Sequence, residues 1–436
     1  MSPARSFCPW SPSFQKPASY PNASSGNFAL QGRAVAGLYD YQLYKGGTTT
    51  PDDGNWYLRS EALPVTPELP VAPEAPGTPE VPGAPEVPGT PEAPSSPEVP
   101  GTPEVPGTPG NPDAPAKPSK PTLSPEPGAY LGNQNAALRM FDHTMHDRVG
   151  EPGLTARKDD GEGFATWMRV KTGKLDSGKI GGQVDVDTNT TVVQLGVEKQ
   201  FDLGAGRLHA GVMGGYGHAS TDAKSRITDH KARGTVNGKN IGVYGTWFQN
   251  PGSAEGAYVD TWLQYGDFDN SVKGDHLGSE KYKSRAWSGS MEAGYSFKVH
   301  QGESHGVYLE PQAQVIHTDY RSDDVREDNG TRVQSGKAGG TTTRLGARVY
   351  ARPLANSTNR IQPFAEVNWW SGGNKSSIAM DGERISHDLP KNILETKVGA
   401  QFEIGRGWSG YGSVGYQQGS NSFSDVSGQV GVKFSF

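Results

Sequence analysis

The C-terminal residues Val430-Gly-Val-Lys-Phe-Ser-Phe436 carry the clearest indication of the fold. Apolar residues occupy the even positions, while Lys433 and Ser435 stand between them, following Gln429. Because successive side chains of a β-strand point to opposite faces, this alternation predicts a strand with one apolar and one polar face. Strands of this kind build transmembrane β-barrels, in which the apolar face meets lipid and the polar face meets the lumen.

The same alternation continues upstream to about Gly163, over about twelve segments separated by turn-rich or charged stretches. In Leu208–Tyr216, Val212 and Tyr216 share a face opposite Met213, and in Ala257–Tyr265 the residue Leu263 opposes Asp260. The polar faces repeatedly carry charge: Arg169, Glu198, Asp260, Glu292, Glu310, Arg344, Arg348, Glu366, Lys397 and Glu403. Charge on the inner face predicts a polar lumen.

A soluble β-sandwich also alternates, so the length of the segments and the position of their aromatic residues decide between the two folds. Segments of about ten or more residues can span a bilayer, and aromatic residues near segment ends are typical of the girdles of membrane barrels. Those aromatic residues are Trp247, Phe248, Trp369, Trp370, Trp408, Tyr416, Phe434 and Phe436. We therefore predict an all-β protein with a twelve-stranded antiparallel barrel over residues 160–436, located in the cell outer membrane.

Composition agrees with a barrel and excludes other classes. Hydrophobic residues make up 33% of the chain, which contains 59 glycines and 34 prolines, and the mean hydropathy is -0.65. No apolar run is long enough for a membrane-spanning helix, whereas a barrel strand needs only alternate apolar residues. The single cysteine, Cys8, excludes a disulfide framework. A net charge of -6 without a basic stripe gives no indication of nucleic-acid binding.

Before the barrel, the sequence predicts four further segments. Residues 1–25 are rich in serine and proline and are predicted to be disordered or foreign to the fold. Residues 26–62 contain two or three short strands, too few to be stable alone, and are expected to cap a larger missing structure. Residues 63–128 form a proline-rich linker, and residues 129–152 contain a helix.

The linker repeats Pro-Glu-Val/Ala-Pro-Gly-Thr/Ala with glutamate at every sixth position from Glu74 to Glu104. Prolines remove amide donors and favour an extended polyproline conformation, and the glutamates repel one another. At about 3.1 Å per residue such a segment extends on the order of 200 Å. The linker is therefore expected to act as a semi-rigid spacer.

The helix is predicted over residues 133–149, where apolar residues recur at spacings of three, four or seven. Leu138, Phe141 and Met145 lie on its apolar face. Asn133 or Asn135 can cap its first turn, and Gly150 ends it.

The N-terminus has no apolar stretch long enough for the core of a signal peptide. An outer-membrane protein must be exported, so we expect the chain to be a fragment, or to have a misplaced start, of a longer exported protein.

Three motifs in this order resemble the autotransporters of type V secretion, in particular their pertactin-like and diffuse-adherence-adhesin-like members. Gly37-Leu-Tyr-Asp-Tyr-Gln-Leu-Tyr-Lys-Gly46 with Asn55-Trp-Tyr-Leu-Arg-Ser-Glu61 resembles the end of their passenger. Tyr130-Leu-Gly-Asn-Gln-Asn-Ala-Ala137 and Met140-Phe-Asp-His-Thr-Met-His-Asp-Arg148 resemble their linker helix. The closing aromatic residues Phe434 and Phe436 resemble the signal that the barrel-assembly machinery reads.

The resemblance implies a translocator that anchors and exports its own N-terminal passenger, an adhesin or virulence factor that is mostly missing here. It also implies help from periplasmic chaperones and the barrel-assembly machinery, insertion into the outer-membrane bilayer, and a monomeric barrel. The segment 26–62 would be the autochaperone-like part that folds first outside the cell.

A barrel of about twelve strands should leave a pore wide enough for one helix, because eight strands fill their own interior and sixteen leave a channel. We therefore expect the helix to plug the lumen. Its Arg139 and Arg148 are expected to face lumenal carboxylates such as Glu292, Glu310 or Glu366, with Asp260 as a further acidic candidate.

Some family members cleave themselves in the lumenal helix, where an asparagine side chain attacks its own backbone carbonyl with help from a lumenal acid. Asn135, and after it Asn133, are the candidates here, although the paired asparagines of the cleaving subgroup are absent. The alternative is that both asparagines only cap the helix.

Other functions find less support in the sequence. An omptin-like protease would need His317-Thr-Asp319 or Asp229-His230 to form a site in the loops, and a diffusion porin should have neither spacer nor helix before its barrel. His143 and His146 are expected to be hydrogen-bonded rather than to hold a metal. The sequence contains no phosphate loop and no His-Glu-x-x-His motif, and we expect no cofactor and no metal.

Overall fold

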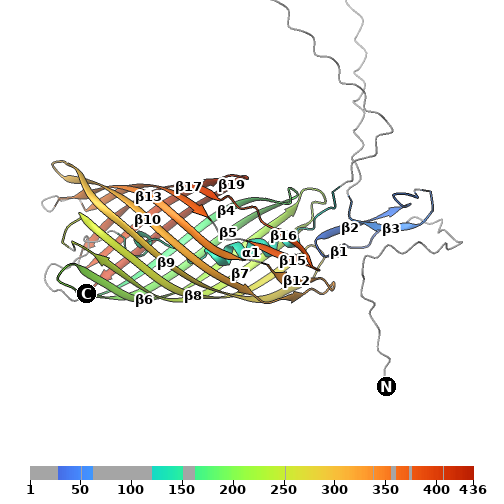
Figure 1. Ribbon diagram of the computed structural model, residues 1–436, viewed down its shortest axis with the longest axis horizontal. Helices are drawn as coiled ribbons and strands as arrows, with labels where there is room; N and C mark the ends of the chain where they lie inside the picture. Colours follow the sequence, from blue (N-terminus) through green and yellow to red (C-terminus); the bar gives the residue numbers. More distant parts are fainter. Residues whose placement is uncertain are drawn as a thin grey trace, which may run out of the picture. The chain divides into compact units, whose positions relative to one another are not determined.

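A computed structural model describes residues 28–50, 52–61, 120–150, 163–250, 252–336, 338–354, 360–372, 376–405 and 407–436 (Figure 1). The segment predicted to be disordered, residues 1–25, lies outside the described residues, as does the linker up to residue 119.

Twelve antiparallel strands form a closed barrel, as the sequence predicts. The last strand pairs with the first along its full length, from Phe423 opposite Ser177 to Ser435 opposite Ala165. The strands are β4 Phe164–Ile180, β5 Val184–Asp202, β6 Arg207–Ser225, β7 Lys231–Phe248, β8 Gly256–Gly274, β9 Ser279–Gln301, β10 His305–Ser322, β13 Gly339–Pro353, β14 Ile361–Gly372, β17 Asn392–Gly405, β18 Trp408–Gly419 and β19 Phe423–Ser435. The shortest contain 12 residues, which is enough to cross a bilayer.

The alternation in the sequence matches the two faces of the barrel wall. Val212 on β6 is 59% exposed on the outer face, while its neighbour Met213 is 3% exposed on the inner face. The same holds in β19, where Val430 is exposed and Gln429 is buried. Apolar residues therefore face outward and polar residues face the lumen, which is the pattern of a barrel surrounded by lipid.

The lumen contains two helices, α1 Glu126–Arg139 and α2 Met145–Val149, in place of the single helix predicted over 133–149 (Figure 1). α1 begins inside the segment assigned to the linker, with Pro125 at its N-cap and Pro127 in its first turn. Proline is tolerated there because the first helical amides lack partners in any case. The prediction that Asn133 or Asn135 caps the helix is wrong, since both lie within α1.

The helical segment is interrupted at residues 140–144, and Thr144 is the N-cap of the second helix, α2. Its hydroxyl accepts a hydrogen bond from the Asp147 amide at 3.2 Å, and the Asp147 carboxylate accepts one from the Thr144 amide at 3.1 Å. This reciprocal capping box stabilises a helix start at that point. The apolar spacing across the break is regular, so periodicity alone could not reveal it.

Glycines on the inner wall allow α1 to lie close to the strands. A side chain at Gly234 on β7 would come within 2.8 Å of the Ala129 carbonyl oxygen, and one at Gly217 on β6 would collide with Met140. Within the helix, a side chain at Gly132 would collide with Thr221 of β6. These positions require glycine because backbone and helix approach one another so closely.

One end of the barrel carries two small sheets, and we call it the cap end. The first contains β1 Ala34–Ala36, β2 Tyr39–Lys45 and β3 Trp56–Arg59, and the second contains β11 Val325–Arg326, β12 Arg332–Ser335, β15 Ser377–Met380 and β16 Glu383–Ser386. Leu38 is buried among Leu123, Val333 and Met380 in a shared apolar cluster. The opposite end, where Phe164 meets Phe436, we call the terminus end.

The two described ends of the proline-rich tract lie together at the cap end. The Thr122 amide donates to the Ser60 carbonyl at 2.6 Å, and the Asp40 amide donates to the Thr122 carbonyl at 3.0 Å. Ser60, before the tract, and Thr122, after it, are therefore direct neighbours in the structure.

Candidate functional site: the lumenal plug

The chain enters the barrel at the cap end and leaves it at the terminus end, so α1 and α2 form a plug in the lumen. Neither described helix is long and apolar enough to cross a membrane. α1 packs against the wall formed by β5, β6, β7 and β8. Its Leu138, together with Phe141 just beyond its end, lies in an apolar cluster with Val192, Val236 and Phe268 of that wall.

Arg148 of α2 is held by Asp260 of β8, and both side chains are fully buried. The guanidinium also donates to the Thr246 hydroxyl at 2.9 Å and lies 4.0 Å from the centre of the Tyr244 ring. Breaking a buried ion pair of this kind leaves an uncompensated charge, which is costly.

The two plug arginines pair with groups other than Glu292, Glu310 and Glu366. Arg148 binds Asp260, the further acidic candidate named from the sequence. Arg139 lies at the end of α1, where it donates to Gln417 at 2.8 Å and lies 3.8 Å from Asp425. The physical reason is the break after residue 139, which turns α2 and changes the strands that each arginine faces.

Glu292 and Glu310 do contact the plug, through groups that the sequence analysis did not pair with them. Glu292 of β9 accepts from the Met145 amide at 3.0 Å, so it occupies the positive N-terminus of α2. Glu310 of β10 lies 2.7 Å from His146 Nε2. Glu366 of β14 binds Arg344 and Arg348 within the wall instead.

Sequence reasoning also missed the ion pair between Asp147 and Lys397 of β17, whose atoms lie 3.0 Å apart. With this pair, four consecutive residues of α2, from Met145 to Arg148, each contact a carboxylate or ammonium group on a different strand. The pattern Thr144-x-x-Asp147 of a capping box was the signal that could have located this second helix.

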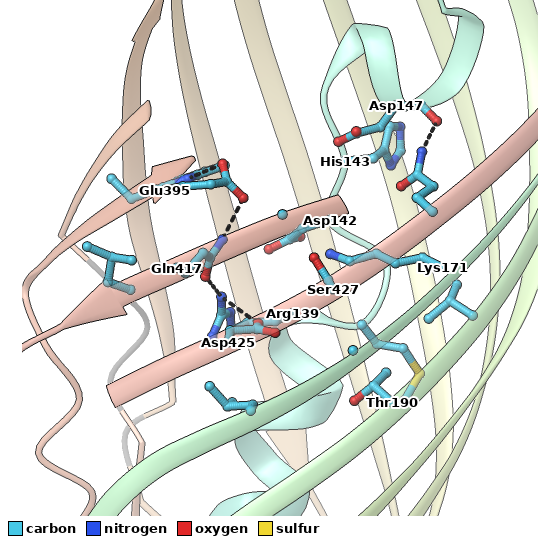
Figure 2. A pocket seen from close by; sticks show the side chains of 18 of the residues that line it. Arg139, Asp142, His143, Asp147, Lys171, Thr190, Glu395, Gln417, Asp425 and Ser427 are labelled. Atoms are coloured by element: carbon cyan, nitrogen blue, oxygen red, sulfur yellow. Dashed lines mark hydrogen bonds and ion pairs between the residues drawn. The ribbon is translucent and has the colours of Figure 1, made fainter. Parts of the chain in front are cut away.

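A cavity of about 170 Å³ lies beside the plug (Figure 2). Its lining includes residues of β4, β17, β18 and β19, the wall away from the side on which α1 packs. Figure 2 shows Lys171, Asp142 and Asp425 around it, and a chain of hydrogen bonds that links Arg139 through Gln417 to Glu395. The plug therefore fills the lumen unevenly and leaves a polar space along one side.

Both candidate asparagines are buried in α1, in different surroundings. The Asn133 side-chain amide donates to the Ser271 carbonyl at 3.0 Å. Asn135 is 2% exposed, lines the cavity, and its side-chain oxygen has no hydrogen-bond partner among the described residues.

Phe434 and Phe436 lie at the terminus end. Phe436 stacks on Phe164, with ring centres 6.1 Å apart, and Phe434 stacks on Trp408 at 4.7 Å. The Phe436 ring is 53% exposed on the outer face, where another protein can contact it.

The residues considered for a metal or a protease have other partners. His143 stacks on Trp262, with ring centres 4.9 Å apart, and its Nδ1 lies 2.9 Å from the Phe141 carbonyl. Within the described residues, no group of three or more histidine, cysteine, aspartate or glutamate side chains could hold a metal ion. His317 lies 2.8 Å from the Thr341 hydroxyl. Asp319 pairs with Arg321, Asp229 with Lys224, and His230 with Asp40.

Comparisons with known proteins agree with the closed-barrel fold and identify the family of the chain. A family model described as the autotransporter β-domain matches residues 166–415. The chain is 32% identical to the Escherichia coli K12 protein YdeU over 95% of this chain and 84% of that one. It is 29% identical to the Escherichia coli autotransporter adhesin AIDA-I over 95% of this chain. The crystal structure of the AIDA-I transport unit is similar, with a TM-score of 0.62, 31% identity, and coverage of 72% of this chain and 99% of that one.

Fold and plug together define an outer-membrane β-barrel with a segment of its own chain through the lumen. The chain belongs to the autotransporter family, and its barrel is an outer-membrane translocator domain. The protease and porin alternatives are not favoured. The chain spans 29% of the length of AIDA-I and 28% of YuaQ, a relative from Escherichia coli K12 that is 34% identical.

Proposed function

We propose that this translocator carries the chain upstream of α1 to the cell surface and then retains α1 and α2 as a plug. The observation that carries the proposal is the path of the chain. Residues 28–61 dock at the cap end, residues 126–149 lie in the lumen, and β4 begins at the terminus end. With the cap end outside the cell, that path is what an exported N-terminal segment would leave behind.

The docking of β1–β3 supports this orientation. Arg33 binds Asp40 of its own sheet at 2.7 Å and Glu126 in the first turn of α1 at 2.6 Å, and all three side chains are 2% exposed. Asp40 also lies 3.2 Å from His230, in the turn between β6 and β7. The part that folds first outside would thereby seat itself on the plug.

A cargo experiment tests the proposal. A small folded reporter with a signal peptide is fused before residue 28 and expressed in a Gram-negative host. We expect an antibody to detect the reporter on intact cells. As a control, a disulfide-locked version of the same reporter should remain inside because it cannot pass the lumen. A reporter that stays in the periplasm while the barrel is correctly inserted would contradict the proposal.

We further propose that the barrel-assembly machinery recognises Phe436, helped by periplasmic chaperones that deliver an unfolded monomer. Support comes from the exposed Phe436 ring at the end of the chain. Phe436→Ala should lower the amount of heat-resistant barrel in the membrane. Phe423→Ala, at the other end of the same strand, is the control, because the Phe423 ring is 2% exposed. Equal losses would point to folding rather than recognition.

We also propose that the natural cargo of this translocator is an adhesin, because the related AIDA-I is named an autotransporter adhesin. Measuring the adherence of cells that display this cargo and of cells that carry only residues 28–436 would test it. Equal adherence would contradict it.

Single-turnover self-cleavage at Asn135 is a second proposal. The Asn135 side-chain nitrogen would attack its own backbone carbonyl carbon, the bond to Ala136 would break, and the Ala136 nitrogen would take the proton. The buried position of Asn135 beside a cavity that contains Asp142 supports it. In Asn133 the amide is already hydrogen-bonded to Ser271. Intact mass of the chain from outer membranes should show a fragment starting at Ala136, absent in Asn135→Gln and kept in Asn133→Gln. A single unprocessed species would contradict the proposal.

A further inference from the structure

At the cap end, the outer face of the barrel carries a belt of aromatic residues. Beyond this belt, charged residues are distributed unevenly around the barrel. On β8 and β9, this belt contains Tyr265 and Trp287, which face each other across the strands with ring centres 5.1 Å apart. Beyond these rings, the outward positions of β7 to β10 carry eight exposed cations: Lys231, Arg233, Lys239, Lys273, Lys281, Lys283, Arg285 and Arg321. The exposed acidic residues there are Asp267, Asp269 and Asp319.

The adjoining wall has the opposite balance. Over the same zone of β4, β5 and β6, three exposed cations stand with four acidic residues: Lys174, Lys179 and Lys224 with Asp176, Asp185, Asp187 and Asp222. Basic residues therefore exceed acidic ones on β7–β10 but not on the adjoining β4–β6, and a general need for solubility would not produce this asymmetry.

Two arginines of this surface lie directly opposite each other. Arg285 of β9 is the cross-strand partner of Arg321 of β10, and both side chains point outward. Like charges in directly opposite positions destabilise a strand pair. Asp319 lies 3.4 Å from Arg321, whereas Arg285 and Lys239 make no ion pair with any described residue. The closest acidic neighbour of both in the ladder is Asp267, which lies between them.

We propose that this surface, centred on Arg285 and Arg321, binds the phosphate groups of lipids in the outer leaflet. A phosphate offers oxygens for two guanidinium groups at once, and it would offset the repulsion between the two arginines. The position directly beyond Trp287 places these cations where lipid headgroups begin, because aromatic belts mark the interface. The proposal rests on the orientation with the cap end outward, but its binding test in detergent does not depend on export.

The test uses the purified full chain in a neutral detergent and measures its binding to bis-phosphorylated lipid A. We expect the intact lipid to bind at least tenfold tighter than the same lipid after its phosphates are removed. The variant Arg285→Gln/Arg321→Gln should bind the lipid about 25-fold more weakly, because each basic residue near an anionic surface strengthens binding about fivefold. Arg285→Lys should retain most of the binding.

The matched control is Lys174→Gln/Lys224→Gln, which removes two exposed cations from the adjoining wall and should leave lipid binding unchanged. All of these side chains are exposed, so the urea midpoint of the barrel should be the same in every variant. Equal binding of phosphorylated and dephosphorylated lipid, or an equal loss in the control variant, would overturn the proposal. Binding of inorganic phosphate alone with the same dependence on Arg285 and an affinity equal to that of the lipid would also overturn it, because lipid would not be the preferred occupant.

Discussion

At the scale of single residues, the buried pair of Arg148 and Asp260 holds the plug to the wall. Asp260→Asn leaves the Arg148 charge buried without a counter-ion, and we expect a loss of about 3–5 kcal/mol in the free energy of unfolding. Urea unfolding of the purified barrel measures it. Asp222→Asn is the control, since its pair with Arg233 is exposed and should matter by less than about 1 kcal/mol. Losses of equal size would show that burial does not decide the effect.

A second prediction at this scale concerns Glu327, which follows β11 at the cap end. Burial is the main cause that raises the pKa of its carboxyl from an ordinary value of 4.5 to about 7. Nearby Glu126 and Glu280 act in the same direction, while the Tyr130 hydroxyl and a hydrogen bond from Asn329 oppose the shift. A carboxyl whose pKa is raised on folding stabilises the fold fully below its unfolded pKa and loses that contribution as pH rises through the folded pKa.

The cap-end sheet should therefore be more stable at pH 5 than at pH 8, by on the order of 2 kcal/mol. Amide hydrogen exchange in β12, corrected for the intrinsic dependence on pH, measures this difference. Glu327→Gln, which resembles the protonated form, should remove it. A difference that persists in Glu327→Gln would assign the effect to another group.

At the scale of elements, the sequence predicted the strands far better than the plug. Alternation reveals strands because every second residue of a barrel wall faces lipid, and Val430 and Gln429 show that contrast directly. The plug has no such contrast. Every described side chain of α1 up to Leu138 is buried, so apolar spacing could not locate either the helix start at Glu126 or the break before Thr144.

The sequence alone also could not identify which side chains form ion pairs across the lumen. The class of partner for Arg148, a lumenal carboxylate, follows from the cost of burying a lone charge. The choice of Asp260 depends on how α2 is turned after the break, which is a property of the packed structure.

The docking of the sheet β1–β3 should not depend on the proline-rich tract. Because the Ser60 carbonyl and the Thr122 amide are hydrogen-bonded, replacing residues 61–120 with four glycines should leave β1–β3 docked. Because the entropy cost of closing a loop grows with its length, shortening the connection about fifteenfold should strengthen docking by about 2 kcal/mol. Exchange of the Asp40 amide, which donates to Thr122, measures docking. Leu38→Asp, which places a charge in the apolar cluster, is the control for loss of docking. If the Asp40 amide exchanges as fast in the deletion variant as in Leu38→Asp, the tract is needed for docking.

At the scale of the whole molecule, the plug should limit conductance. Twelve strands without α1 and α2 should leave an open pore, whereas in the plugged barrel the helices occupy the lumen beside a cavity of about 170 Å³. We expect deletion of residues 126–149 to raise single-channel conductance several-fold in a planar bilayer. Unchanged conductance after the deletion would contradict the plug.

In the proposed topology the chain runs from the cell surface through the lumen to the periplasm, and limited proteolysis of intact cells can detect this path. In cells that carry Asn135→Gln, which excludes the proposed self-cleavage, protease added outside should cut within residues 61–120. It should leave a membrane fragment that begins near Lys120 and includes the protected plug, as mass spectrometry would show. Cleavage of that tract only after the outer membrane is permeabilised would place the cap end in the periplasm and contradict the account.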